Sequence, residues 1–283
     1  MQRALIIGGA GFIGSNLCRA LAADWSVVSL DNYFTGSRDN HIEGVEYIEG
    51  EAAEIAHLID GSVDLVVHLG EYSRVEQSLE DIDTVWRLNN SAMMPVMRFA
   101  TQQGAKLVYS GSSTRFGDGG DTVTQTPYAW LKAKNVELLK QYADWYPLDY
   151  AIVYFYNVYG PGEIASGRYA TVVAKFLAMA ARGEPLTVTL PGTQQRTFTH
   201  VDDIIAALLL VIAAGHGDGH GIASDESWSI LQLAEQLTDN VVMTPAKQGN
   251  RQSTEIVTAK TRALGWRPEK SLSDYLAVSH PSL

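Results

Sequence analysis

The sequence is poor in cysteine. Cys18 is the only one among 283 residues, so no disulfide can form within the chain. A lone cysteine fits a reducing compartment, and within SNLCRAL we expect Cys18 to be a small packing residue on a helix. No apolar run approaches the length of about 20 residues that a membrane span requires. The first residues, MQRALIIGGAG, show no signal-peptide cleavage pattern, and we therefore expect a cytoplasmic protein.

Basic residues are also scarce. The chain has 21 lysines and arginines against 32 aspartates and glutamates, which gives a net charge of -11. This field repels polyanions and argues against nucleic acid or an anionic membrane as a partner. Phosphate groups of a small ligand must therefore be held by local features, such as backbone N–H groups, helix N-termini and a few arginines.

The first half of the chain alternates short β-branched runs with amphipathic segments. Strands are expected at 3–7, 26–30, 45–49, 63–69, 105–110 and 149–155, and helices at about 12–23, 83–103 and 128–145. Strands that alternate with helices form parallel sheets covered on both faces. The sequence therefore predicts an α/β fold, a doubly wound parallel sheet of the Rossmann type with about seven strands.

The rhythm changes after Pro161. Helices are expected near 169–182 and 202–214, and a strand at 186–190. We predict a Rossmann domain over 1–160, with later segments, about 192–215, interleaved, and a smaller C-terminal lobe formed mainly by 161–283. The run GHGDGHG (215–221) is expected to be a solvated loop without metal, because glycines flank both histidines and no carboxylate or cysteine cluster accompanies them.

The segment LIIGGAGFIGSNL predicts a phosphate cradle. Gly8, Gly11 and Gly14 follow the first strand and open the first helix, where glycines allow a tight turn and a close approach of backbone to a pyrophosphate. Asp31 ends the second strand, where a carboxylate accepts hydrogen bonds from an adenosine ribose. The two features together indicate a dinucleotide site.

Asp31 also favours NAD over NADP. A carboxylate at this position repels a 2′-phosphate, and the next residues, Asn32 and Tyr33, supply no cation to offset it. Arg38 is the nearest basic residue, and we expect it to lie too far along the loop.

The segment TPYAWLKAK contains a candidate proton-handling pair. Tyr128 and Lys132 are four residues apart and share a helix face. Hydride removal from a carbinol carbon requires a base for the hydroxyl proton, and a tyrosine serves only when a nearby cation stabilises its anion. Ser112 in YSGSSTRFG, after the fifth strand, is a candidate hydrogen-bond donor to the substrate oxygen. Spacing alone leaves open the alternative of two ordinary helix residues.

These motifs occur with VVHLG, FYNVYGPG, PGTQQRTFTHVDDI and LGWRP, in family order and over essentially the whole chain. In this combination the chain resembles the extended short-chain dehydrogenase/reductase family, NAD-dependent epimerase/dehydratase branch, and within it the UDP-glucose/UDP-galactose 4-epimerases. The resemblance implies an NAD cofactor, a nucleotide-sugar substrate and an isomerase of carbohydrate metabolism.

The resemblance also implies roles for individual residues. Tyr128 is the expected base, Lys132 binds the nicotinamide ribose and tunes the tyrosine, and Ser112 bonds the reacting hydroxyl. Expected cofactor contacts are Gly8, Gly11, Phe12, Ile13, Gly14, Asp31, Asn32, Leu69, Asn89, Tyr128 and Lys132, with a structural role beside the active site as the alternative for Asn89. Expected substrate contacts are Ser112, Asn157, Arg196 and Arg251, the last with a solvated surface arginine as the alternative.

Several positions depart from the family pattern. Gly70 and Glu71 stand where two alanines are usual, Glu51 where an aspartate near the adenine is usual, and Tyr154 where an arginine is common. We expect Glu71 to be a solvated loop residue. The alternative is a carboxylate beside the nicotinamide that changes how cofactor or sugar is held.

The fifth-strand motif distinguishes between two reactions. Dehydratases of the family carry an Asp-Glu pair directly after the serine or threonine, and here those positions are Ser113 and Thr114, which are not competent acids or bases at neutral pH. We therefore expect a nucleotide-sugar 4-epimerase acting through a transient 4-keto sugar. The alternatives are a 4,6-dehydratase or other C4-oxidising relative that uses an acid such as Glu71, and a non-enzymatic NAD-binding regulatory protein.

The resemblance further implies a homodimer. Family members pair through the helix before the fifth strand and the helix of the tyrosine and lysine. The apolar residues available on these two helices are Met93, Met94, Met97, Leu138, Leu139 and Tyr142. The same residue types also serve for packing against the sheet.

Overall fold

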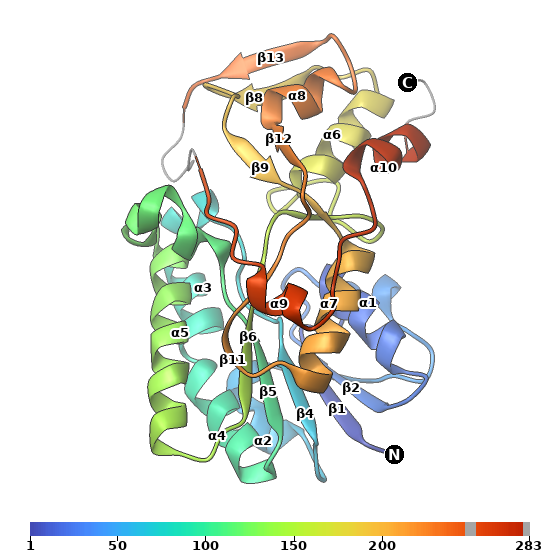
Figure 1. The fold of residues 1–283 in the computed structure, drawn as a ribbon. Coiled ribbons are helices and arrows are strands. Elements are labelled where there is room, and N and C mark those ends of the chain that lie inside the picture. Colours follow the sequence, from blue (N-terminus) through green and yellow to red (C-terminus); the bar gives the residue numbers. More distant parts are fainter. Residues whose placement is uncertain (247–252, 280–283) are drawn as a thin grey trace.

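The computed structural model describes residues 1–246 and 253–279. Its largest element is a seven-stranded sheet in the order β11-β6-β5-β4-β1-β2-β3 (Figure 1). The strands are β1 (Arg3–Ile7), β2 (Ser26–Asp31), β3 (Glu46–Glu49), β4 (Leu65–His68), β5 (Lys106–Ser110), β6 (Tyr150–Phe155) and β11 (Gly217–Ile222). Every neighbouring pair is parallel. The predicted doubly wound sheet is confirmed, and its strand order reverses between β1 and β4, where such sheets bind ligands.

Helices cover both faces of this sheet (Figure 1). The short α2 (Ile55–Leu58), α4 (Met93–Gln103) and α5 (Pro127–Trp145) pack on one face, and α1 (Phe12–Leu21) and α7 (Val201–Ala214) on the other. The central strands are consequently buried on both faces, which explains their continuous apolar runs. No helix of the described residues combines the length and the apolar character needed to cross a bilayer.

The predicted helix over 83–103 is interrupted. The structure has α3 (Ile82–Val85), a π-helical stretch η4 (Trp86–Asn90) and only then α4. The wider turn directs Asn89 inward, where its amide oxygen accepts from Tyr72 N at 2.7 Å and its amide nitrogen donates to Tyr72 O at 3.0 Å. Such π-turns are frequent near functional sites, and this one fixes the loop after β4.

The smaller lobe is built from short elements above the carboxyl ends of the strands (Figure 1). They are β7 (Val158–Tyr159), α6 (Val172–Ala181), β8 (Leu186–Thr189), β9 (Gln195–Thr197), β10 (Thr199–His200), β12 (Ser227–Ser229), α8 (Ile230–Glu235), β13 (Val241–Thr244) and α10 (Leu272–Ser279). The strand predicted at 186–190 is β8, which pairs with β13 outside the main sheet. Single turns complete the fold at η1 (Arg38–Asn40), η2 (Ala52–Glu54), η3 (Glu76–Leu79), η5 (Ser113–Phe116) and η6 (Asp118–Thr124).

The prediction of a solvated loop at 215–221 is wrong. Residues 217–222 form β11, the edge strand of the main sheet, which pairs in parallel with β6. The glycines serve close packing here, because a Cβ on Gly221 would lie 2.1 Å from Val257 O, and Gly221 N donates to that carbonyl at 3.0 Å. His220 is buried beside His216 O, and the described residues contain no group that would hold a metal ion.

The C-terminal segment returns to the large lobe. After β13 the described chain resumes at 253 and runs beside β11 into α9 (Ala259–Ala263) (Figure 1). Trp266, of the LGWRP motif, is 2% exposed and donates from Nε1 to Asp203 O at 2.9 Å. Of the predicted 192–215, only the residues from Val201 pack in the large-lobe cluster, where the segment of Trp266 joins them, whereas β9 belongs to the smaller lobe.

The proposed apolar dimer seam lies mostly in the core. Met93, Met97 and Leu139 are fully buried, and Tyr142 is 5% exposed. Met94 and Leu138 are partly buried against the same cluster. Core packing was the alternative use of these residue types, and the structure adopts it because the face of each helix that carries them faces the sheet.

Candidate functional site

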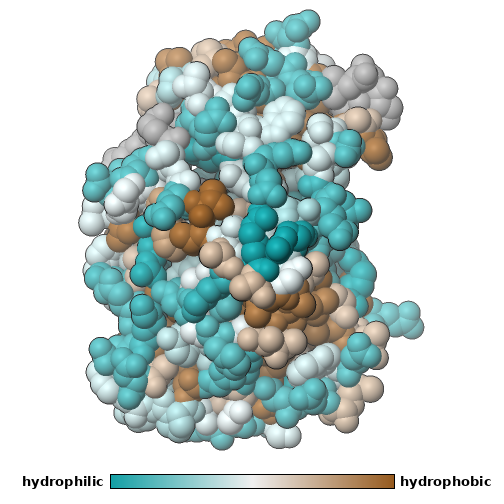
Figure 2. Space-filling view, in the orientation of Figure 1, coloured by the Kyte–Doolittle hydropathy of each residue, from teal (hydrophilic) through white to brown (hydrophobic). Residues whose placement is uncertain are grey.

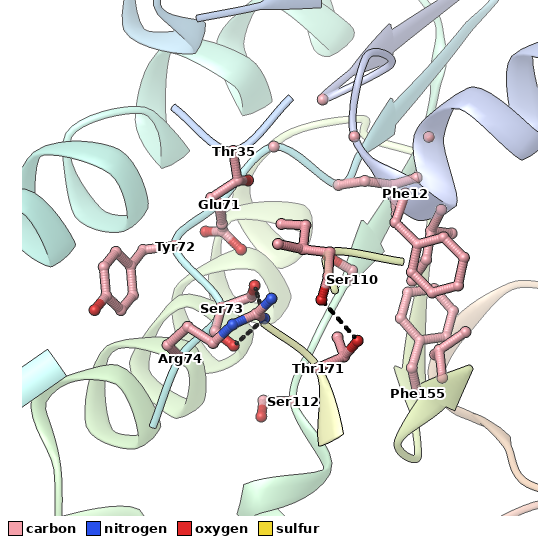
Figure 3. Close-up of a pocket in the computed structure, with 18 of the residues that line it drawn as sticks. Phe12, Thr35, Glu71, Tyr72, Ser73, Arg74, Ser110, Ser112, Phe155 and Thr171 are labelled. Atoms are coloured by element: carbon pink, nitrogen blue, oxygen red, sulfur yellow. Dashed lines mark hydrogen bonds between the residues drawn. The ribbon is translucent and has the colours of Figure 1, made fainter. Parts of the chain in front are cut away.

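A cavity of about 430 Å³ opens at the carboxyl ends of the strands, between the two lobes. Most predicted site residues line it: Gly8, Gly11, Phe12, Ile13, Gly14, Asp31, Asn32, Leu69, Ser112, Tyr128, Lys132 and Asn157. Figure 3 shows Glu71, Arg74 and Ser112 toward one side of this cavity and the rings of Phe12 and Phe155 on the other. The structure thus brings the glycine turn and the candidate proton-handling pair to one site.

The glycine turn fits a dinucleotide. Gly8 has φ +86, and a Cβ there would lie 2.7 Å from Gly70 Cα, so the turn requires glycine. Asp31 is 7% exposed, and its two carboxylate oxygens accept from Ala10 N at 2.9 Å and Tyr33 N at 2.8 Å. Burial raises the pKa of the Asp31 carboxyl. Each oxygen keeps an acceptor position, so the carboxylate still suits a ribose diol.

Arg38 does not approach Asp31 as a free cation. Its guanidinium pairs with Glu49 at 2.6 Å and lies 4.8 Å from the centre of the Tyr33 ring.

The candidate base lies in the first turn of α5. Thr126 caps the helix by accepting from Ala129 N at 3.3 Å, and Pro127 occupies the first helical position. Tyr128 is 8% exposed and Lys132, one turn later, is 4% exposed. Both side chains reach the cavity.

Ser112 is placed by the end of β5. It caps the short turn η5, and its hydroxyl lies 2.8 Å from the hydroxyl of Thr114. Both residues are buried and line the cavity. Ser113 lines it as well, so the two positions after Ser112 present hydroxyls and no carboxylate.

Glu71 is not the solvated loop residue that we expected. Its side chain is 2% exposed and forms an ion pair with Lys132. Tyr109 OH donates to Glu71 Oε1 at 3.1 Å, and Asn135 Nδ2 donates to the same oxygen at 3.2 Å. The loop after β4 turns this residue inward because Asn89 holds the next residue, Tyr72, by both main-chain groups.

Arg74 is a site residue that the sequence analysis missed. It lines the cavity, and burial lowers the pKa of its guanidinium. Its partners are neutral: the carbonyls of Tyr169 and Ser73 and the Ser73 hydroxyl. Within the described part of the chain no carboxylate lies within 4 Å of it. The only sequence signal was a cation three residues after the unusual Glu71.

Other predicted contacts lie elsewhere. Asn89 is fully buried and holds the loop after β4, so it is a structural residue here and not a wall of the cavity. Arg196 lies on β9, donates to Gln195 O at 2.8 Å and does not line the cavity. Arg251 lies outside the described residues.

Two further departures from the family pattern have structural partners. Glu51 pairs with Arg87 and accepts from Asn32 Nδ2 at 3.3 Å. Tyr154 is fully buried, and its hydroxyl donates to Asp218 Oδ1 at 2.7 Å.

The chain is similar to known proteins over nearly its whole length. Residues 4–223 match the model of the NAD dependent epimerase/dehydratase family. UDP-glucuronic acid decarboxylase 5 of Arabidopsis thaliana is 28% identical over 98% of this chain and 88% of its own length. UDP-glucose 4-epimerase of Thermotoga maritima superposes with a TM-score of 0.90 at 24% identity, covering 99% of this chain and 98% of that one. A dTDP-glucose 4,6-dehydratase of Streptomyces venezuelae superposes with a TM-score of 0.89 at 24% identity, covering 99% and 96%.

Proposed function

Since this chain belongs to the NAD dependent epimerase/dehydratase family, we propose that it is a nucleotide-sugar 4-epimerase acting on a UDP-sugar. The observation that carries the proposal is the meeting of Ser112, Tyr128 and Lys132 at the wall of the cavity that the glycine turn also lines. The family is NAD dependent, and Gly8 and Asp31 fit that cofactor.

The proposed roles follow from these positions. Ser112 hydrogen-bonds the C4 hydroxyl of the sugar, and the Tyr128 phenolate removes its proton. NAD, when bound, accepts the hydride from C4 and returns it. Tyr128 then gives the proton back to the C4 oxygen after the 4-keto sugar has turned its other face toward the cofactor. Configuration at C4 changes, and no atom of the sugar is lost.

The acid and base of a 4,6-dehydratase have no counterpart at the expected positions. Ser113 and Thr114 occupy them, and hydroxyls neither remove a C5 proton nor protonate a leaving C6 oxygen at neutral pH. Glu71, the alternative acid, has its carboxylate engaged by Lys132, Tyr109 and Asn135. These contacts argue against its use as a proton donor.

A second candidate is decarboxylation of a UDP-uronate, and Arg74 favours it. A buried guanidinium with only neutral hydrogen-bond partners at the cavity wall suits a carboxylate, and the similar Arabidopsis thaliana protein is a UDP-glucuronic acid decarboxylase. Loss of the carboxylate from a 4-keto uronate needs no acid–base pair at Ser113 and Thr114. If Arg74 binds a sugar carboxylate, Arg74→Gln should raise the KM for a UDP-uronate about tenfold or more and leave that for the neutral UDP-sugar unchanged.

The mass of the product distinguishes the reactions. We would incubate the protein and NAD with UDP-glucose, UDP-N-acetylglucosamine and UDP-glucuronate in deuterated water and analyse products by NMR and mass spectrometry. Epimerisation leaves the mass unchanged, puts no deuterium on carbon and inverts C4 alone. Loss of carbon dioxide identifies the decarboxylase. Loss of water with deuterium on the sugar carbons contradicts both proposals in favour of a dehydratase.

A pure NAD-binding protein would behave differently. It would bind cofactor, but fluorescence of reduced NAD would not appear with any sugar nucleotide. The built-in proton-handling pair argues against this outcome, because a binding module needs neither a buried lysine nor a buried tyrosine at the cavity.

We also propose a cytoplasmic homodimer. In place of the seam expected from sequence, exposed large apolar side chains on and beside α5 include Ile82 and Trp86, 53% and 50% exposed, and Trp130 and Trp145 on α5, 41% and 63% exposed. Sedimentation at micromolar concentration tests this assembly, and a monomer at all concentrations would contradict it.

A further inference from the structure

We propose that Glu71 is a positioning residue that holds Lys132 and offsets its charge beside Tyr128. The catalytic part of this proposal rests on the proposed function. The contacts of Glu71 do not depend on that function. Glu71 replaces a small apolar residue of the family pattern, and no role in the reaction has been assigned to it above.

Glu71 is held from two elements at once. Lys132 and Asn135 reach it from α5, and Tyr109 reaches it from β5. With its side chain 2% exposed, the carboxylate is removed from water and depends on these partners. A buried ion pair of this kind keeps both members in place, because separating them leaves a bare charge in the interior.

The lysine is equally constrained. Lys132 Nζ donates to Glu71 and to the carbonyl of Ser110, and lies 4.7 Å from the centre of the Tyr109 ring. An ammonium has three donors, so these contacts leave one for a ligand in the cavity. Glu71 therefore sets the direction in which Lys132 presents its remaining N–H.

Further hydrogen bonds hold the residues around Glu71 in place. Asn135 donates to Asn89 O at 2.9 Å as well as to Glu71. Asn89 in turn holds both main-chain groups of Tyr72, the residue after Glu71. The π-turn, α5 and the loop after β4 are thus linked by Asn89 and Asn135, and Asn135 also bonds the buried carboxylate of Glu71.

The surroundings of the pair determine its electrostatic effect. His68 is fully buried beneath it, and burial lowers the pKa of its imidazole to about 4, so it is neutral at pH 7. Burial raises the pKa of the Tyr109 hydroxyl, which is also neutral. Tyr128 therefore shares the cavity wall with a lysine whose charge is opposed by that of Glu71.

Other charges reach Tyr128 from the cavity side. Arg74, on the loop after β4, lines the cavity together with Tyr128; burial lowers the pKa of its guanidinium, and Tyr128 is among the groups that oppose this. Glu163, on the loop after β7, lines the same cavity, and burial raises the pKa of its carboxyl. Among the described residues, Arg74 has no carboxylate within 4 Å. The electrostatic field at Tyr128 therefore depends on Arg74 and on how far the charge of Glu71 offsets that of Lys132.

The test is the ionisation of Tyr128 in four proteins: the parent, Glu71→Gln, Lys132→Met and the double variant. The ultraviolet absorbance of tyrosinate is titrated in each, and the curve of a matched Tyr128→Phe protein is subtracted, so that no turnover is needed. Glutamine has the shape of glutamate without its charge. Glu71→Gln should move the midpoint to lower pH by on the order of one unit, and Lys132→Met should move it higher.

The double variant makes the prediction stringent. If the two charges offset one another, removing both should return the midpoint close to that of the parent. The double variant contains no unpaired buried charge from this ion pair, so the prediction can still be tested with it if Glu71→Gln alone fails to fold. Glu137→Gln is the matched control, since Glu137 pairs with Lys134 on the exposed side of the same helix, and it should leave the midpoint unchanged.

Turnover provides the second readout. In Glu71→Gln the acid limb of the kcat profile should move with the tyrosinate midpoint, and Glu71→Asp should restore part of the parent behaviour. A folded Glu71→Gln, or double variant, whose midpoint does not follow this pattern overturns the proposal and leaves Glu71 a packing residue. Absence of turnover with every sugar nucleotide would instead refute the proposed function, while the titration would still decide the role of Glu71.

Discussion

Lys132 follows Tyr128 by one turn of α5, and both side chains reach the wall of the same cavity. The register is set where the helix begins, because Thr126 caps it and Pro127 fixes its first residue. From helical spacing alone, a joint role of Tyr128 and Lys132 in proton transfer was only a hypothesis. The burial of both side chains beside Ser112 makes it testable residue by residue.

Tyr128→Phe should retain the fold and NAD binding but lose about 100-fold or more in turnover, because the ring still packs while the proton acceptor is gone. Steady-state kinetics with the best UDP-sugar, together with NAD titration by calorimetry, measure both quantities. Near-normal kcat in a variant of unchanged NAD affinity would show that another group acts as the base.

Asp31→Asn should narrow the preference for NAD over NADP about tenfold or more, because a charge-assisted contact is worth about 1.5–3 kcal/mol. Asparagine is preferable to alanine here, since an oxygen remains to accept from Ala10 N or Tyr33 N. Calorimetry with both cofactors measures the ratio. Equal affinities of the parent for NAD and NADP would refute the role of Asp31.

His68 should make the protein less stable in mild acid. Its folded-state pKa is lowered to about 4, so the unfolded chain takes up a proton below about pH 6.5 that the folded chain refuses. Stability is therefore lost as the pH falls from about 6.5 to about 4, by about 3 kcal/mol at the lower end. Urea unfolding across this range should give a flatter profile for His68→Leu than for the parent. The exposed His57, changed to Gln, should keep the parent profile, and identical profiles for parent and His68→Leu would contradict the assignment.

Trp266→Ala should destabilise the protein by about 3–5 kcal/mol, because it empties a buried site against α7 and removes the indole N–H that donates to Asp203 O. The 63% exposed Trp145 is the control, and its change to Ala should cost no more than about 0.5 kcal/mol. Urea unfolding compares the two. A small effect at Trp266 would mean that the C-terminal segment is not docked on the large lobe as described.

Sequence patterns predicted the sheet well and its last strand badly. The runs at 3–7, 26–30 and 149–155 are apolar and β-branched, as strands buried on both faces must be. In β11 the glycines that permit the close approach of Val257 also erase the usual strand signal. Long-range contact, and not local propensity, makes that segment a strand.

Some residues of the candidate site could also be predicted from the sequence, and others could not. Gly8, Asp31, Tyr128 and Lys132 belong to motifs with fixed spacing, and each could be placed before the fold was known. Glu71 could not, because its burial depends on partners from β5 and α5 that lie far along the chain. A carboxylate in a loop ordinarily remains in water, so sequence alone favoured the wrong environment.

The position of β11 has a consequence for biosynthesis. When the ribosome has released residues 1–214, six strands of the sheet are available, but the outer edge of β6 still lacks the partner that 217–222 will provide. An unpaired edge on a parallel sheet is a template for association with other chains. Slow translation or truncation just before residue 217 should therefore yield an aggregating chain, whereas a chain that also includes β11 and the segment of Val257 beside it should be relieved of this defect.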